Sequence, residues 1–155
     1  MHRTFTVPVK PHLKKFILKR FAQKSAIICV EHESIENKTG SSFDKMIQLC
    51  LRDNRKRSEF NDQYRDKLTA ELTIKLGTEL NKLSPRIGKL MRINIYADNL
   101  FKEALMVWIE AQGEDGIAPY SACKSFLKFY DIDENDYALQ TAYQYYQRKN
   151  GSKQK

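Results

Sequence analysis

Apolar residues recur at helical spacing from Gly88 to Gln112, and this long periodicity constrains the fold more than any other feature of the chain. Spacings of three and four residues place side chains on one face of an α-helix. The pattern predicts a buried central helix, although Arg92–Tyr96 also alternates as a strand would. The apolar positions are Leu90, Ile93, Ala97, Leu100, Phe101, Ala104, Leu105 and Trp108.

Two other stretches alternate apolar and polar residues, which is typical of a strand with one buried face. They cover residues 3–9 and 67–76, and Gly77 closes the second. Because Pro8 has no backbone N–H to donate, we expect the first strand at a sheet edge. The apolar run Ala26–Val30 predicts a third strand near residues 25–32, with a loop beginning at Glu36.

Helices are also expected at residues 10–21, 42–54, 121–130 and 137–150. Pro11 suits the first turn of the first of these helices. Ser41 or Ser42 would cap the second, which would bury Leu49 or Cys50. Asp133 or Asn135 would cap the last.

Glycine and proline are sparse, 6 and 4 in 155 residues, which disfavours a turn-dense sandwich or barrel. We therefore predict an α+β fold, mainly α-helical with a few short strands and a C-terminal helix-turn-helix-like pair. The expected parts are residues 1–60, basic and N-terminal, and residues 61–155, the two together forming one compact unit.

The net charge of +8 is concentrated at the two ends of the chain. Residues 1–24 carry seven Lys/Arg and no acid, and residues 139–155 carry four Lys/Arg and no acid. Residues 113–138 carry six acids and two lysines. Such basic ends attract polyanions, of which nucleic acid is the commonest in a cell. The plainer interpretation, that any basic protein has basic faces, stays open.

Several classes of function are disfavoured. No apolar run approaches the roughly 18–20 residues of a membrane span, and no signal peptide is expected, so we predict a cytoplasmic protein with no membrane partner. Cys29, Cys50 and Cys123 are too widely spaced for a disulfide framework. The calcium-loop pattern of Asp131–Asp136 lacks its central glycine and its final glutamate. We expect no metal, no cofactor and no enzymatic activity.

Two constellations remain for binding. Thr4–Phe21, "TFTVPVKPHLKKFILKRF", is a strand followed by a basic helix. At the C-terminus, "TAYQYYQRKNGSKQK" combines tyrosines, glutamines and a basic tail, and the stripe from Leu139 to Tyr146 is its core candidate. Tyr145 would then face outward. The expected nucleic-acid-binding residues are Arg3, Lys10, Lys14, Lys15, Lys19, Arg20, Tyr145, Gln147, Arg148, Lys149, Lys153 and Lys155.

The first constellation resembles the opening of a ribbon-helix-helix protein, and the second resembles a helix-turn-helix pair in outline. The first resemblance implies groove contacts by Arg3, Thr4 and Thr6 and phosphate contacts by Ser41 and Ser42. This chain departs from that family because a segment with its own strand pattern separates the two helices. Either module would suit a homodimer on duplex DNA.

A further resemblance, to small uncharacterised mobile-element and phage proteins of gut Bacteroidota, is carried by Phe5–Lys10 and by "FLKFYDIDENDY…AYQYYQR". It implies a mobile-element or phage context and no particular activity. We therefore expect a non-catalytic DNA-binding regulator or accessory factor of replication or transfer. The alternative is a structural or protein-interaction module, such as a phage or assembly component, whose basic ends bind an acidic protein partner.

Overall fold

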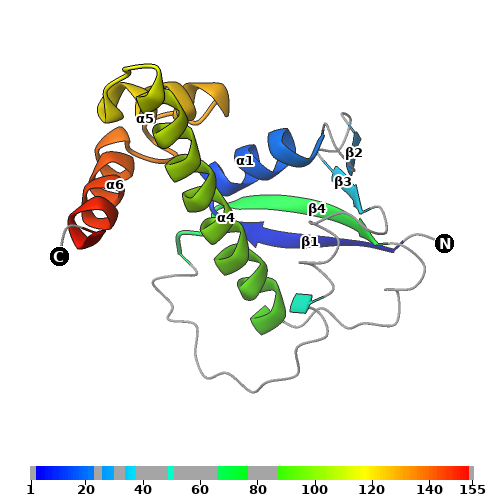
Figure 1. Cartoon of the computed structure of the whole chain (residues 1–155). Coiled ribbons are helices and arrows are strands. Elements are labelled where there is room, and N and C mark those ends of the chain that lie inside the picture. Colours follow the sequence, from blue (N-terminus) through cyan, green and yellow to red (C-terminus); the bar gives the residue numbers. More distant parts are fainter. Residues whose placement is uncertain are drawn as a thin grey trace. The chain divides into compact units, whose positions relative to one another are not determined.

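The fold is α+β and mainly helical, as the sequence predicted (Figure 1). The computed structural model describes residues 3–22, 26–29, 34–37, 49–50, 66–76 and 87–153. Its elements are β1 (Arg3–Val9), α1 (Pro11–Ala22), β2 (Ala26–Cys29), β3 (Ser34–Asn37), β4 (Ala70–Leu76), α4 (Ile87–Glu114), α5 (Pro119–Phe129) and α6 (Leu139–Lys153).

Contacts divide the chain into two compact units, Met1–Asp98 and Asn99–Lys155, and the boundary falls within α4. The sequence had placed a division near residue 60. It differs because β4, assigned by the sequence to the second part, pairs with β1 of the first, from Arg3 opposite Leu76 to Val9 opposite Ala70. Composition along the chain carries no record of such a distant pairing.

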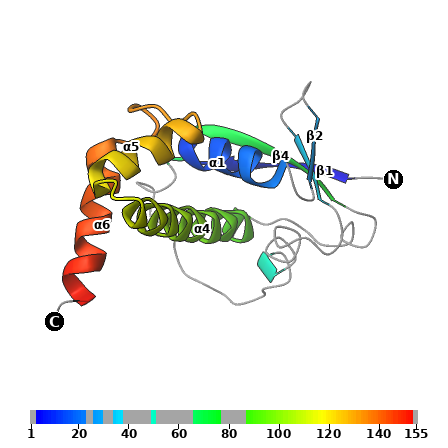
Figure 2. The same ribbon diagram turned by 45° about the horizontal axis from the view of Figure 1, so that its top comes forward.

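The sheet of the first unit has the strand order β1-β4-β3-β2. β1 and β4 are antiparallel, β3 and β4 are parallel, and β2 and β3 are antiparallel. β1 forms one edge, as Pro8 predicted, and Pro8 lies opposite Glu71. Helix α1 runs alongside β1 and β4 in both ribbon views (Figures 1 and 2).

The prediction for residues 25–37 was partly wrong. The structure has two short antiparallel strands there, β2 and β3, where the sequence indicated one. Glu36 and Asn37 belong to β3, whereas they were predicted to open a loop. Ser34–Asn37 has weak strand propensity, and its conformation follows from pairing with β2 on one side and with β4 on the other.

Alternate residues of β1 and β4 build the core of the first unit together with α1 and the first half of α4. Burial of a Val, Leu, Ile or Phe side chain contributes about 1.5–3 kcal/mol. Of the predicted helix at residues 42–54, only Leu49 and Cys50 are described; both are helical, and Cys50 is the buried one. The buried apolar side chains of the sheet and the two helices are Val7, Val9, Leu13, Phe16, Ile17, Leu72, Ile74, Met91, Ile93 and Ala97.

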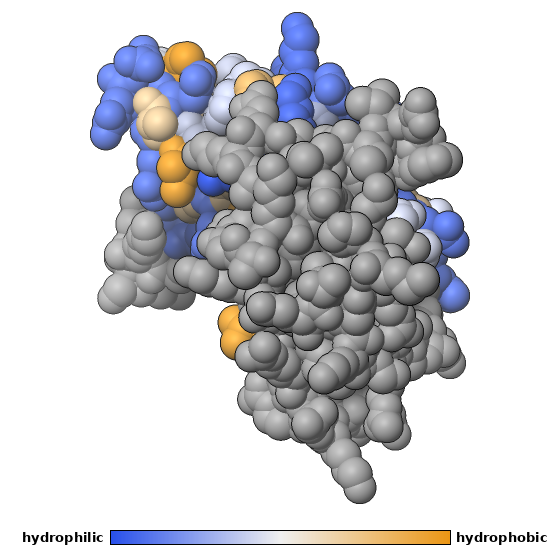
Figure 3. Space-filling model, turned by 90° about the vertical axis from the view of Figure 1, so that its right-hand side faces the viewer, coloured by the Kyte–Doolittle hydropathy of each residue, from blue (hydrophilic) through white to orange (hydrophobic). Residues whose placement is uncertain are grey.

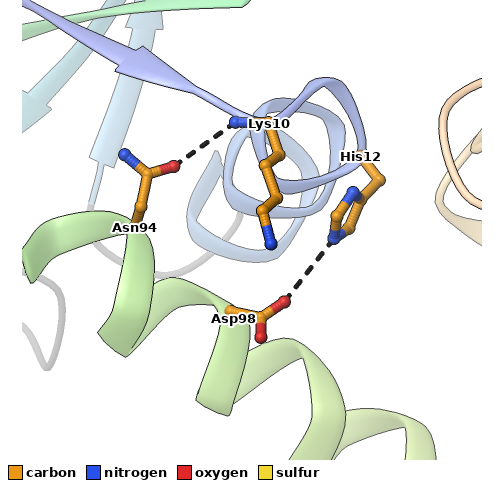
Figure 4. A network of polar contacts seen from close by, with 4 residues as sticks. All are labelled: Lys10, His12, Asn94 and Asp98. Atoms are coloured by element: carbon orange, nitrogen blue, oxygen red, sulfur yellow. Dashed lines mark hydrogen bonds and ion pairs between the residues drawn. The ribbon is translucent and has the colours of Figure 1, made fainter. Parts of the chain in front are cut away.

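A buried side-chain amide holds the junction between β1 and α1 (Figure 4). Asn94 of α4 is fully buried, and its Nδ2 donates to the Pro8 carbonyl oxygen at 2.6 Å. Its Oδ1 accepts from the Lys10 backbone N–H at 3.3 Å. One turn further along both helices, His12 Nε2 lies 3.7 Å from Asp98 Oδ1. The junction and the first turn of α1 are therefore fixed to α4 by polar contacts.

We expect Asn94→Ala to lower the free energy of unfolding by about 2–4 kcal/mol, because it leaves a buried carbonyl and a buried N–H without their partner. Urea unfolding followed by far-ultraviolet circular dichroism measures this loss. Asn99→Ala is the matched control, an exposed asparagine on the same helix, and should change stability by about 0.5 kcal/mol or less. Equal effects of the two substitutions would contradict the assigned role of Asn94.

The buried ladder of α4 corrects the predicted apolar stripe. Ile93, Ala97, Phe101, Leu105 and Ile109 are spaced by four residues and all are buried. The predicted core positions Leu100 and Trp108 lie beside this ladder, so Leu100 is 36% exposed and Trp108 is half-buried. The strand alternative for Arg92–Tyr96 is wrong as well, because these residues are helical, with Ile93 buried and Ile95 38% exposed.

Aromatic rings fill the core of the second unit. Phe101 meets Phe126 and Tyr137 edge to face, with ring centroids 5.4 and 5.1 Å apart. Trp108 donates through Nε1 to Ser125 Oγ at 2.9 Å, which satisfies the indole N–H. α5 therefore packs on the second half of α4 through specific ring contacts.

Local backbone features end α4 and α5 and begin α6. Gly116, at φ 79°, follows α4, and Asp131, at φ 55°, follows α5, a conformation that aspartate tolerates better than most residues. The cap of α6 differs from both predicted residues: Glu134 Oε2 accepts from the Leu139 N–H at 3.1 Å. Asp133 instead accepts from the backbone of Asn135 and Asp136 within the preceding turn.

The described side chains that reach the face drawn in Figure 3 are mostly hydrophilic, with a few separate hydrophobic spots. Among the exposed large apolar side chains, Val107 is 65% exposed and Phe129 is 44% exposed. Isolated exposed apolar residues are normal on a folded protein.

Cys123 makes the stability of the second unit depend on alkaline pH. Its thiol is fully buried, and burial raises its pKa from 9.0 to about 11. Since the folded state holds this proton more tightly, the stabilisation is complete below pH 9 and is lost as pH rises toward 11. We expect the stability difference between wild type and Cys123→Ser to change by about 2–3 kcal/mol over that range. Urea unfolding followed by Trp108 fluorescence tests this, and a difference independent of pH would contradict it.

Candidate nucleic-acid interface

The N-terminal candidate residues lie along β1 and α1. Arg3 begins β1, and Lys10 joins β1 to α1. Helix α1 turns Leu13, Phe16 and Ile17 into the core and contains no acidic residue. Its basic side chains remain at or near the surface: Lys14, Lys15 and Lys19 are half-buried and Arg20 is exposed.

The basic side chains of α1 repel one another. Lys15 and Lys19 are one turn apart, and a like-charged pair at this spacing costs a helix a few tenths of a kcal/mol. Lys19 and Arg20 lie in the last turn, where the helix dipole favours positive charge and offsets part of this cost. An anion bound along α1 would lower the remaining repulsion.

The two sets of candidate residues lie in different units of very different charge. Residues 1–98 carry 20 Lys/Arg and 11 Asp/Glu, a net charge of +9. Residues 99–155 carry seven Lys/Arg and eight Asp/Glu, a net charge of −1. The excess positive charge of the chain therefore belongs entirely to the first unit.

Helix α6 has one packed side and one polar side. Ala142 is fully buried, and Leu139, Tyr143 and Tyr146 beside it are half-buried, so the predicted stripe packs with Ala142 at its centre. Side chains that donate and accept hydrogen bonds cover the opposite side. We call this exposed surface the α6 polar face; it consists of Gln140, Thr141, Gln144, Gln147 and Arg148.

The α6 polar face carries hydrogen-bonding groups of the kind that read DNA bases. Glutamine pairs with adenine, arginine pairs with guanine, and threonine contacts either through its hydroxyl. Only Gln147 and Arg148 of this face were expected to bind. The other three were missed because their spacing was visible in the sequence but the side of the helix that packs was not.

Tyr143 and Tyr146 contribute rings to the packing of α6. Tyr143 meets Tyr120 of α5 edge to face at 5.4 Å between ring centroids, and it stacks with Tyr146 at 6.4 Å. These two tyrosines are therefore held by contacts within the second unit.

Tyr145 is placed differently from the prediction. It was expected to face outward, but it is half-buried, and two ammonium groups lie over its ring. Lys102 Nζ is 5.4 Å and Lys149 Nζ is 5.8 Å from the ring centroid. Lys102 comes from α4, and nothing in the sequence associates it with α6. We call these three residues the lysine–tyrosine cluster.

The energies in this cluster are small and nearly balanced. A cation over an aromatic ring at an exposed site gains about 0.5–1 kcal/mol. Two ammonium groups about 11 Å apart in water repel each other by about 0.4 kcal/mol, and by more at closer range. The ring of Tyr145 therefore offsets the cost of holding Lys102 and Lys149 near each other.

Charge is segregated along α6. Asp131, Asp133 and Glu134 lie exposed in the turn before the helix, whereas Arg148 and Lys149 lie toward its C-terminus. Carboxylates near a helix N-terminus and cations near its C-terminus are both favoured by the helix dipole. The acidic turn would repel phosphates, so a polyanion can approach only the C-terminal half of α6.

The described residues offer little for catalysis or metal binding. His12 and Asp98 form an ion-pair contact only if the histidine is protonated, and His12 is buried away from substrate (Figure 4). No group of three or more His, Cys, Asp or Glu in the described part of the chain could hold a metal ion. Within the same residues, no helix combines the length and apolar character needed to cross a membrane.

The remaining candidate residues cannot be placed in full. The side chains of Arg3 and Lys153 are outside the described part of the structure, as are Ser41, Ser42 and Lys155. Comparisons with protein-family models, with curated proteins and with solved structures find no match for this chain.

Proposed function

We propose that the protein binds duplex DNA without catalysing a reaction, and that the α6 polar face contacts the DNA. The observation that carries this proposal is the composition of that face. Over residues 139–151, every exposed residue of α6 is polar, basic or glycine, and none is acidic. A helix of this kind fits the major groove, where bases present hydrogen-bond donors and acceptors.

The same composition disfavours a protein partner at α6. The cores of protein interfaces are enriched in aromatic and other apolar side chains. The α6 polar face has none, and the tyrosines of α6 are occupied in contacts within the unit. Hydrogen bonding to a polar, charged surface is therefore the better use of this side of the helix.

The first unit would supply the long-range attraction. Its net charge of +9 draws phosphates from a distance, and α1 presents a basic surface without an acidic residue. Combined with the helix pair α5 and α6, this supports a DNA-binding regulator or accessory factor of replication or transfer on a mobile element or phage. Such a protein would act in the cytoplasm, as a homodimer on paired half-sites.

Arg148→Ala should weaken binding to a random-sequence duplex and reduce the slope of log affinity against log salt by about 0.9, the value for one lost phosphate contact. Fluorescence anisotropy over a salt series measures both quantities. Lys124→Ala is the matched control, since it removes one positive charge from an exposed site on α5 of the same unit. It should leave the slope nearly unchanged.

Two results would contradict the proposal. The first is absence of binding to duplex DNA at about 50 mM salt, where counterion release favours binding strongly. The second is an equal loss of affinity from Arg148→Ala and Lys124→Ala, which would mean that total charge alone decides. Gel shifts with single-stranded DNA and RNA establish whether duplex DNA is preferred.

Exposed apolar residues on α4 favour a second candidate, a protein-interaction module. Leu100 and Val107 lie two turns apart on the exposed side of α4, and Glu103 and Glu110 are exposed on the same side. Because Val107 is exposed, Val107→Gln should change the free energy of unfolding by no more than about 0.5 kcal/mol. If α4 binds a second copy, the substitution should lower the mass measured by analytical ultracentrifugation. An unchanged mass would count against this candidate.

A further inference from the structure

We propose that Lys102 and Lys149 together hold a phosphate of the bound nucleic acid, and that Tyr145 is the positioning residue that presents both ammonium groups. This site deepens the proposed function and rests on it. The ligand class is a phosphodiester oxyanion. The α6 polar face accounts for contacts to bases, and the lysine–tyrosine cluster would fix where α6 lies along the duplex.

The geometry brings together two cations from different helices. Lys149 follows Tyr145 by one turn on α6, whereas Lys102 comes from α4. Their ammonium nitrogens lie 5.4 and 5.8 Å from the Tyr145 ring centroid, so they are at most about 11 Å apart, the sum of these two distances. The pair includes one half-buried and one exposed lysine, and both reach the same ring.

The ring itself is poorly placed to stack on a base. Stacking needs an open ring face, as in proteins that bind single strands through aromatic side chains. Tyr145 is half-buried, and ammonium groups lie over its ring. Its contribution to binding is therefore to restrict the lysines, which lowers the entropy lost when a long side chain is immobilised on a ligand.

Phosphate is the anion that this arrangement fits best. Lysine binds phosphate as a point charge with three N–H donors, and it does not require the planar geometry that arginine matches. Contacts to phosphates fix the register of a protein on the duplex, while contacts to bases provide sequence preference. Lys149 is the immediate neighbour of Arg148, so the cluster borders the α6 polar face along the helix.

Three variants test the site, each checked for folding by circular dichroism. Lys102→Gln removes the cation from α4 and should reduce the salt slope on a random-sequence duplex by about 0.9. Tyr145→Phe keeps the ring and should bind as the wild type does. Tyr145→Leu removes the ring without changing charge, and affinity should fall by about threefold to tenfold, the loss expected when two weak cation–π contacts no longer hold the lysines.

The outcomes separate this site from the proposed function. If wild type binds duplex DNA and Arg148→Ala weakens it, but Lys102→Gln behaves like the control Lys124→Gln, only the phosphate site is overturned. If Tyr145→Leu binds as tightly as Tyr145→Phe, the positioning role is overturned. Combining Lys102→Gln with Tyr145→Leu should cost less than the sum of the two single losses, and full additivity would contradict the coupling. A wild type that binds no nucleic acid overturns both proposals.

Discussion

The two hydrogen bonds of the Asn94 side chain fix the direction in which the chain leaves the sheet. Pro8 and Pro11 restrict the backbone on either side of Lys10, and the short connection cannot satisfy its own polar groups. Asn94 supplies one donor and one acceptor from a fully buried position, so the junction is held to α4 rather than to water. The orientation of α1, and with it the side on which its lysines appear, depends on this amide.

Helix stability alone explains some features of α6 but not all of them. The dipole accounts for carboxylates before the helix and for Arg148 and Lys149 near its end, with no ligand involved. It does not account for Lys102, which lies in the middle of α4, far from either end of that helix. Nor does it explain an exposed side rich in glutamine, a residue without charge. These two features distinguish a binding surface from a well-capped terminal helix.

The sequence predicted elements whose patterns are local and failed where structure depends on distant contacts. The alternation in β1 and β4 and the long periodicity of α4 identified all three, because each buries one face of a regular element. β3 was missed because its pairing partners, not its residues, make it a strand. Leu100 and Trp108 were placed in the core because a helix offers several stripes three and four residues apart, and only packing selects the ladder through Ile93 and Phe101. Lys102 could not be associated with Tyr145, since their proximity arises from the packing of the second unit.

Under the proposed function, the two units divide affinity from recognition. A unit with a net charge of −1 gains little from long-range attraction to phosphates, so the α6 polar face would find DNA slowly by itself. The first unit, at +9, provides that attraction but presents on α1 lysines that bind phosphate without regard to sequence. Sequence preference must then come from the glutamines and Arg148 of α6. The acidic turn before α6 sharpens this division, because it excludes phosphates from the N-terminal end of the helix and leaves the C-terminal half, where the lysine–tyrosine cluster lies, as the only approach.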